Sequence, residues 1–410
     1  MGLKPLVLLS VTILFLYRLW LSYLERRSAA NPIPANVADV YDTDTYKKWR
    51  AYRAEKSRCG MWHAAAAFAI EMILLAADVY AAFARLFPQA DFPQMFAVLL
   101  LSALSELPLI PFEWHDTMVI EEKYGFNRTG KKTFWADQVK NFVISLLIIT
   151  LIGLALMATH RALGDWLILA FAGILMLFAL AVSFLYPFFS RIFNKFTPLE
   201  DGELKDRLTA LLEKNGYRVR AIQVMDASRR TSKSNAYFTG FGRMKTIVLY
   251  DTLVRAMTPD EICAVFAHEM GHGLHRDTLK NQILSFAQMA CLAVLAWLTL
   301  RSPANFTPFG FAGVNYGFAL VLITSVEFAL LTPLAGLIFN AHSRRAEYRA
   351  DAQAVAEGYG GALVGALKKL ARENFADLAP DPLIVQLEYS HPTLSQRIAA
   401  IERAEARRGA

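Results

Sequence analysis

The chain has few cysteines and few charged residues for its length. Only three cysteines stand among 410 residues, and none belongs to a C-x-x-C pair. Because their number is also odd, neither a disulfide framework nor a thiolate metal site is expected. Charged residues make up only 19% of the chain and hydrophobic residues 55%, and the mean hydropathy is +0.30. This composition argues against an ordinary soluble enzyme and predicts a chain embedded in a lipid bilayer.

Long apolar runs are abundant instead. A membrane-spanning helix needs about 20 predominantly apolar residues. Seven such runs occur, at about residues 5–24, 62–86, 93–111, 141–159, 164–188, 281–300 and 317–339. The first run carries Arg18 and Trp20 late and lacks a clean small-residue cleavage site, which favours an uncleaved anchor over a signal peptide. The expected fold class is therefore mainly α, with seven transmembrane helices.

The segments between these runs alternate in positive charge. Those rich in Lys and Arg are 25–59, 112–140 and 190–280. Those with one such residue or none are 88–91, 160–163 and 301–316. Lys and Arg stay preferentially on the cytoplasmic side, so we expect the N-terminus outside and the large loops and C-terminus in the cytoplasm. This asymmetry accounts for the net charge of +7 without a nucleic-acid partner.

Four parts follow from this pattern. They are a bundle of five spans over 1–194, a cytoplasmic α/β metalloprotease region over 195–280, two further spans over 281–340, and C-terminal cytoplasmic helices over 341–410. Within the second part the periodicity predicts a helix over 203–215 and strands over 218–225, 235–241 and 246–250, the last two joined by a turn at 242–245. We expect strand 235–241 to bind an extended peptide along its free edge, the alternative being an ordinary hairpin strand.

Four carboxylates fall inside predicted spans, namely Glu71, Asp78, Glu106 and Glu327. A carboxylate in hydrocarbon is costly, so we expect each to face the bundle interior or water. The alternative is that some of them mark the end of a span that is shorter than the apolar run.

A well-defined helix start precedes the main functional motif. Thr258 is a good N-cap, Pro259 suits the first turn, and Glu261 completes a capping box. The expected helix carries H-E-x-x-H at residues 268–272. Residues four apart share a helix face, so the two imidazoles can bind one zinc ion at about 2.0–2.1 Å. Glu269 lies beside them as the candidate general base toward a water at the metal. The alternative is a polar helix that matches the motif by chance.

A catalytic zinc needs a third protein ligand and an open position. The best candidate is Glu347, which follows the last span on the same side as His268 and His272. Asp351 lies four residues further and could accept a hydrogen bond from the far nitrogen of a ligand histidine. The alternative is a solvated charged helix face paired with neighbouring arginines. We expect one Zn²⁺ per chain, bound by His268, His272 and Glu347.

At these residues the chain resembles the type I CAAX prenyl endopeptidase family, which are seven-span membrane zinc metalloproteases. The resemblance covers nearly the whole chain. Besides H-E-x-x-H it rests on segments 121–127, 193–199, 234–238, 340–351 and 391–397. Each segment is weak alone, but the ordered set is specific. The resemblance implies seven helices around a large water-filled chamber, with the zinc site near its cytoplasmic side. It also implies the same three zinc ligands, with Glu269 catalytic.

The resemblance further implies that Asn235, His391 and Arg397 lie close to the site. Asn235 and His391 could hydrogen-bond a developing oxyanion, and Arg397 could hold a carboxylate or brace Glu347. Without the resemblance, His391 would be interpreted as a helix-start residue. Many eukaryotic members carry a histidine where this chain has Asp277, which suggests a prokaryotic-type branch and a bacterial inner membrane.

Several functions remain open from the sequence. The first is an endopeptidase that cleaves membrane-associated polypeptides near their C-terminus, with prenylated polypeptides among the candidate substrates. The second is a membrane quality-control protease with no prenyl requirement, which uses the same site. A seven-span receptor or transporter is disfavoured by H-E-x-x-H with a suitable third ligand. A catalytically inactive scaffold is disfavoured by the intact Glu269.

Overall fold

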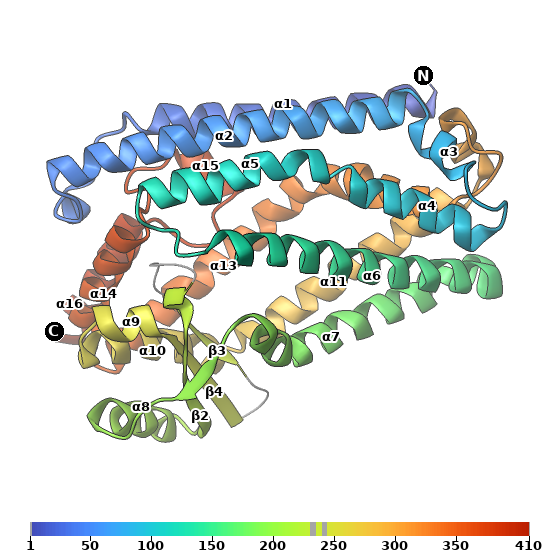
Figure 1. Ribbon diagram of the computed structural model, residues 1–410. Coiled ribbons are helices and arrows are strands. Elements are labelled where there is room, and N and C mark those ends of the chain that lie inside the picture. Colours follow the sequence, from blue (N-terminus) through green and yellow to red (C-terminus); the bar gives the residue numbers. More distant parts are fainter. Residues whose placement is uncertain (1, 230–234, 240–243, 410) are drawn as a thin grey trace.

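The chain folds into a long bundle of helices with a smaller α/β part at one end (Figure 1). The computed structural model describes residues 2–229, 235–239 and 244–409. The bundle consists of α1 Leu3–Ser28, α2 Thr43–Ala76, α3 Val79–Ala84, α4 Asp91–Leu104, α5 Ile110–His115, α6 Lys131–Leu163, α7 Leu167–Phe193, α11 Asp277–Leu300, α12 Tyr316–Val321 and α13 Phe328–Ala356. Two π-helical turns, Asp116–Glu121 and Leu322–Glu327, continue α5 and join α12 to α13.

Six stretches of the described chain are long and apolar enough to cross a membrane. They are Leu3–Ser28, Thr43–Ala76, Asp91–Glu121, Lys131–Val182, Asp277–Leu300 and Tyr316–Ala356. They support the expected mainly α, multi-pass membrane protein. The fourth stretch contains both α6 and α7, between which a 3-10 turn at Gly164–Trp166 reverses the chain (Figure 1). The count of seven spans stays a prediction.

The second span differs from its predicted bounds. The run 62–86 was expected to be one helix, but α2 begins at Thr43 and ends at Ala76. Asp78 adopts φ of 55°, a left-handed conformation that stops the helix. Its carboxylate lies 2.7 Å from the Lys4 ammonium. Asp78 therefore marks the end of a span, whereas Glu71 stays within α2, with an oxygen 3.4 Å from the Tyr80 hydroxyl.

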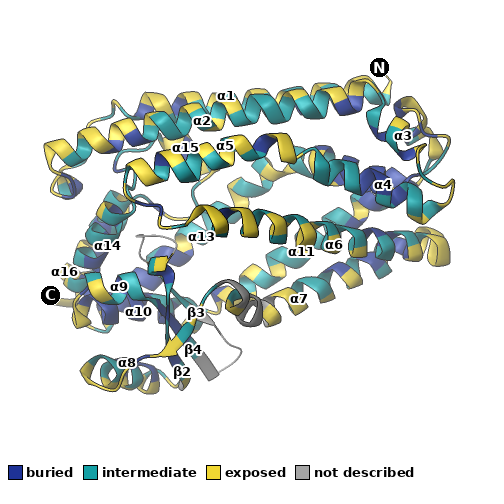
Figure 2. Ribbon diagram, viewed as in Figure 1, coloured by how far each residue is buried: buried dark blue, intermediate teal, exposed yellow. Residues whose placement is uncertain are grey.

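Apolar side chains on the outside of the bundle follow helical spacing. Six large side chains exposed along α1 are separated alternately by three and four residues, and they are Leu6, Leu9, Ile13, Leu16, Trp20 and Tyr23. This spacing gives one continuous stripe on the helix. Figure 2 shows such exposed positions along the long helices, while α10 is largely buried. The stripe suits contact with acyl chains, and its aromatic end suits the membrane interface.

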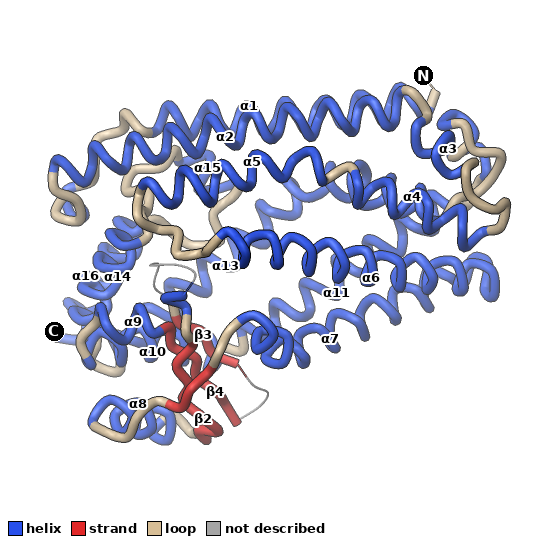
Figure 3. The backbone as a smooth tube through the Cα atoms, viewed as in Figure 1, coloured by secondary structure: helices blue, strands red, loops and turns tan. Residues whose placement is uncertain are grey.

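The α/β part contains a four-stranded sheet flanked by helices (Figure 3). Its strands, in the order β1-β2-β4-β3, are β1 Phe196–Pro198, β2 Arg218–Met225, β4 Met244–Tyr250 and β3 Ala236–Thr239. Strands β2 and β4 run parallel, and β3 pairs antiparallel with β4 through Tyr237 and Val248. Strand β3 is therefore an edge strand.

Most local predictions in this part are confirmed. The predicted helix appears as α8 Glu203–Lys214, and strand 218–225 coincides with β2. Met244 and Lys245 belong to β4 rather than to the predicted turn, since pairing with β2 extends that strand. Residues 234 and 240–243 lie outside the described residues. They include the end of the predicted strand 235–241, part of its turn at 242–245, and the first residue of the family segment 234–238. Strand β1 was missed, because three residues carry no periodicity.

Helix α10, Pro259–Leu274, is the element that positions the candidate site. The Thr258 hydroxyl accepts from the Glu261 N–H, and the Glu261 carboxylate accepts from the Thr258 N–H, so the predicted capping box is confirmed. A Cβ on Gly271 would lie 2.8 Å from the Ala350 Cα. Glycine therefore lets α10 approach α13 closely, which places the H-E-x-x-H turn against the turn that carries Glu347. The remaining helices are α9 Asp251–Ala256, α14 Gly360–Glu373, α15 Pro382–Leu387 and α16 Leu394–Gly409.

Candidate metal centre and active site

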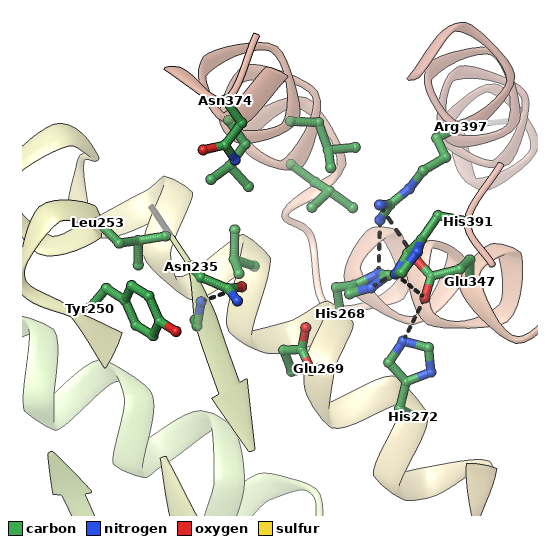
Figure 4. Close-up of a pocket in the computed structure, with 15 residues that line it drawn as sticks. Asn235, Tyr250, Leu253, His268, Glu269, His272, Glu347, Asn374, His391 and Arg397 are labelled. Atoms are coloured by element: carbon green, nitrogen blue, oxygen red, sulfur yellow. Dashed lines mark hydrogen bonds and ion pairs between the residues drawn. The ribbon is translucent and has the colours of Figure 1, made fainter. Parts of the chain in front are cut away.

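Three side chains from two helices converge on one point at the α10–α13 contact (Figure 4). His268 and His272 come from successive turns of α10, and Glu347 comes from α13. One ligand atom from each lies within 4.8 Å of the other two, so the group could hold a metal ion. His268 and Glu347 are buried. The three residues predicted as ligands are thus brought together across two intervening spans.

The distances within the group are compatible with one bound ion. The Nε2 atom of His272 lies 3.2 Å from one Glu347 oxygen, and that of His268 lies 3.5 Å from the other. Ligands at about 2.0–2.1 Å from zinc are about 3.3–3.4 Å apart along a tetrahedral edge. The Glu347 Oε2 atom is also buried without a hydrogen-bond partner among the described residues. This oxygen lies 3.5 Å from His268 Nε2 and 3.4 Å from the Arg397 guanidinium, and a bound metal ion would satisfy it.

The other nitrogen of each ring faces a carboxylate. His268 Nδ1 lies 2.8 Å from Asp351, and His272 Nδ1 lies 3.1 Å from Asp277. A proton held on Nδ1 leaves the Nε2 lone pair free toward Glu347. The predicted contact of Asp351 with a ligand histidine is therefore present. Asp277 as partner of His272 was missed, although a carboxylate five residues beyond the motif was a usable signal.

Arg397 of α16 is bound mainly to Asp351. Its Nε and one terminal nitrogen donate to the two Asp351 oxygens at 3.0 and 2.6 Å. The other terminal nitrogen lies 3.4 Å from Glu347. The arginine thus holds a carboxylate bidentately, as expected, and it also lies beside Glu347. Asp351 consequently links α10, α13 and α16 through a single buried side chain.

These contacts shift the protonation of the two motif histidines and of the glutamate. Burial alone would lower the pKa of His268, but its close contacts with the Asp351 and Glu347 carboxylates raise that pKa to about 9. Burial likewise opposes a charged His272, yet the hydrogen bond to Glu347 leaves its pKa raised. Conversely, both imidazoles hold the pKa of Glu347 well below its usual range against the effect of burial. Glu347 is therefore a carboxylate anion, which is the form that binds a cation.

The remaining predicted site residues line one cavity of about 600 Å³. Glu269 and Asn235 border it on one side of the metal group, and His391 borders it on the other (Figure 4). His391 Nε2 lies 3.4 Å from Glu347. Asn235 is exposed, and its side-chain oxygen accepts from the Ala236 N–H. Asn235 and His391 therefore approach the cavity from opposite sides of Glu269.

One wall of the cavity is apolar, which sequence reasoning missed. Its side chains come from α9, α10 and α14, and they are Leu253, Val265, Leu363, Leu367 and Leu370. Tyr250 and Asn374 complete the same side (Figure 4). Positions 363, 367 and 370 have the spacing of one helix face, a signal that was visible but looks like ordinary core packing. Val265 of this wall lies one helical turn before Glu269 on α10.

The fold and sequence of known proteins match this arrangement over nearly the whole chain. CAAX prenyl protease 1 of Saccharomyces cerevisiae is 30% identical over 423 residues, which cover 95% of this chain and 92% of the yeast protein. The Oryza sativa homolog is 30% identical over 420 residues and 98% of each chain. A crystal structure of S. mikatae Ste24p superposes with a TM-score of 0.86 at 29% identity, covering 98% of this chain and 99% of that one.

Two family models divide the chain between them. The CAAX prenyl protease N-terminal region, described as five membrane helices, matches residues 22–195. Peptidase family M48 matches residues 198–405, which include all three candidate metal ligands. The chain therefore belongs to the CAAX prenyl protease family, integral-membrane proteases with a peptidase part of family M48.

Proposed function

We propose that this protease is a zinc-dependent endopeptidase with one Zn²⁺ per chain, bound by His268, His272 and Glu347. The observation that carries the proposal is the convergence of two Nε2 atoms on a buried carboxylate that has an unsatisfied oxygen. Two imidazoles and one carboxylate form a catalytic zinc ligand set, since three protein ligands leave the fourth position open. Asp351 and Asp277 orient the rings by accepting their Nδ1 protons.

The chain's own residues then move the protons of peptide hydrolysis. A zinc ion held by His268, His272 and Glu347 would supply Lewis-acid chemistry and would lower the pKa of the reacting water to about 7. Glu269 takes a proton from the attacking water as its oxygen bonds to the peptide carbonyl carbon, and it delivers that proton to the leaving nitrogen as the C–N bond breaks. His391 donates to the carbonyl oxygen as this atom gains negative charge. Asn235 supplies a second donor from the opposite side, and Arg397 holds Asp351 in place.

The cavity supports an extended polypeptide as substrate. Edge strand β3 begins directly after Asn235, which lines the cavity, so a peptide can add to this edge as a further strand. The apolar wall of α9, α10 and α14 then receives an apolar side chain next to the scissile bond. Together with the CAAX prenyl protease names of the relatives, this supports cleavage beside a prenylated cysteine that is followed by aliphatic residues.

The orientation in the membrane belongs to the same proposal. The basic loops and the C-terminus face the cytoplasm, the N-terminus faces out, and the site opens toward cytoplasmic substrates. A quality-control protease that clears membrane-bound chains uses the same residues and requires no prenyl group. The apolar wall accepts either kind of chain. A bacterial inner membrane would favour the second kind of substrate.

The test compares zinc content and cleavage in purified full-length protein. The substrate is a fluorogenic peptide with a cysteine followed by two aliphatic residues, prepared with and without a farnesyl group. Wild type should contain about one zinc per chain and cleave, and His268→Ala or His272→Ala should lose both properties. Glu269→Gln should keep zinc and lose cleavage by about 10²–10⁴-fold or more. Full zinc in both histidine variants would refute the ligand set. Equal cleavage of both peptides would select the substrate class without a prenyl requirement.

A further inference from the structure

A second set of contacts on α13 holds the segment that carries His391. Gly336, Asn340 and Arg344 are spaced four residues apart, so they lie on one face of the helix. All three meet backbone carbonyls of α15 or of the residues that follow it. We call these three residues the α13 clasp. Glu347 lies three residues beyond Arg344, so the clasp and the metal ligand occupy successive turns of one helix.

The clasp satisfies carbonyls that α15 leaves free. The last carbonyls of a helix have no partner within it. One terminal nitrogen of Arg344 lies 2.8 Å from the Val385 oxygen and 2.7 Å from the Tyr389 oxygen. The Asn340 amide donates to the Leu387 oxygen at 2.6 Å. The side chains of α13 thus cap α15 from outside.

Close approach of the two backbones is part of the same arrangement. A Cβ on Gly336 would lie 3.2 Å from the Leu387 oxygen, a contact tighter than most. Because this position is glycine, the end of α15 rests directly on α13. The chain continues from the capped residues through Ser390 to His391 without a further turn of helix.

His391 depends on this segment for its position. Its side chain is 63% exposed, so packing does not fix it. Its contacts are Ser390 Oγ, at 2.9 Å from Nδ1, and Glu347, at 3.4 Å from Nε2. We propose that Asn340 and Arg344 are positioning residues that place His391 at the reacting carbonyl by capping α15. This inference rests on the proposed function of His391 as oxyanion donor.

The inference predicts that Arg344 and His391 act as one unit. Arg344→Met should lower kcat by about 10²-fold, as a misplacement of about 1 Å can, while zinc content and KM change little. In the His391→Ala background the same substitution should cost less than about 3-fold, since coupled residues are not additive. Arg344→Lys should restore part of kcat, and Asn340→Ala should give a smaller loss of the same kind.

Arg345 provides the matched control. It is the neighbouring arginine on α13, it is exposed, and it makes no hydrogen bond or ion pair within the described parts of the chain. Arg345→Met should therefore leave kcat unchanged. If Arg344→Met lowers kcat by the same factor in wild type and in His391→Ala, the inference is overturned, since the clasp would then act on stability or on another group. Wild-type kcat in Arg344→Met would overturn it as well.

A second readout does not depend on turnover. Carbethoxylation by diethyl pyrocarbonate, followed by mass spectrometry of zinc-loaded protein in detergent, reports how freely each histidine reacts. Because Nδ1 contacts Ser390 Oγ and Nε2 lies beside Glu347 when no substrate is bound, His391 should react slowly in wild type and in Arg345→Met. It should react several-fold faster in Arg344→Met. If the reactivity of His391 is unchanged in Arg344→Met, the clasp is refuted, even if the wild-type protein cleaves no peptide. If wild type cleaves no peptide but His391 reacts faster in Arg344→Met, only the proposed function is refuted.

Discussion

At the scale of single residues, the site is organised by carboxylates that do not face the metal position. Asp351 accepts from His268 and from Arg397, and Asp277 accepts from His272 and from Arg349. Each carboxylate therefore fixes one ring and is itself held by one arginine. Such partners tune metal affinity without being ligands.

The first prediction at this scale concerns Asp277. Asp277→Asn should weaken zinc binding by about 10–100-fold, because an amide accepts the Nδ1 proton less strongly than a carboxylate does. Zinc affinity is measured by competition with a chromophoric chelator. Asp351→Asn should give a similar loss, whereas Glu347→Ala should remove zinc and cleavage together. If the Asp277→Asn or Asp351→Asn protein contains no zinc while the Glu347→Ala protein retains it, the assigned roles would be exchanged.

The second residue-scale prediction concerns the apolar wall. Leu367→Phe should fill part of the cavity and reduce kcat/KM for peptides with leucine after the scissile bond. Peptides with alanine there should be affected less. One methylene in an apolar pocket is worth about 1–3 kcal/mol, so a shift of about 10-fold in the ratio is expected. Leu370→Phe is a companion variant on the same face of α14. An unchanged ratio in both variants would remove this wall from substrate binding.

At the scale of elements, the start of α10 determines where the motif lies. The capping box of Thr258 and Glu261 sets the register of the helix ten residues before His268. The Glu261 carboxylate also lies 2.7 Å from the Lys369 ammonium, which joins α10 to α14. Burial would raise the pKa of Glu261, but Lys369 and the Thr258 N–H outweigh burial and hold that pKa below its ordinary value. The ionised form therefore stabilises the folded state.

The prediction for this element is a pH-dependent loss of stability. Thr258→Ala should cost about 1 kcal/mol of unfolding free energy. A carboxyl with a lowered folded-state pKa stabilises above its unfolded pKa and stops doing so as pH falls through the folded value. The contribution of Glu261 should thus be present at pH 7 and decline below about pH 4. Thermal unfolding in detergent should show a decrease in Tm between pH 7 and about pH 3 that is smaller in Glu261→Gln than in wild type. An equal decrease in both proteins would contradict this role.

At the scale of the whole molecule, the loops between the long helices separate to two ends as their charges predict. Arg161 pairs with Asp91, and His160 lies 3.1 Å from the Tyr316 hydroxyl, so three loops poor in Lys and Arg meet at one end. At the other end, Lys368 of α14 lies 2.7 Å from Asp39. Figure 1 places the N-terminus and the C-terminus at opposite ends. The three candidate metal ligands lie at the same end of the molecule as the basic loops.

The prediction at this scale concerns membrane topology. Single cysteines at Ala90, Ala162 and Ala304 should react with an impermeant thiol reagent from outside intact cells. Cysteines at Asp44, Gly130 and Ala406 should react only after permeabilisation. The native free cysteines Cys59, Cys263 and Cys291 are first replaced by alanine. All six positions are exposed, so a lack of labelling reports sidedness. Labelling of position 406 from outside would reverse the orientation.

The sequence alone determined the features that depend on local chemistry. The capping box, the four-residue spacing of His268 and His272, and strand 218–225 depend on neighbours in the chain, and all three are present as predicted. The apolar runs likewise identified a multi-pass membrane protein, because hydrophobic length is a local property. Glu347 was selected as third ligand because it follows the last apolar run on the side of the H-E-x-x-H helix, and the resemblance to a known family supported the same residue.

Tertiary structure decided what depends on residues far apart in the chain. The end of α2 at Ala76 follows from the left-handed Asp78 and its contact with Lys4, not from hydropathy. The pairing of Asp351 with Arg397 and the apolar wall beside Glu269 exist only because α10, α13, α14 and α16 pack together. The α13 clasp joins α13 to α15, and no hydrophobic periodicity in the sequence predicts that contact. The physical reason is that hydrophobic pattern and helix capping act over a few residues, whereas ligand orientation depends on which helix faces meet.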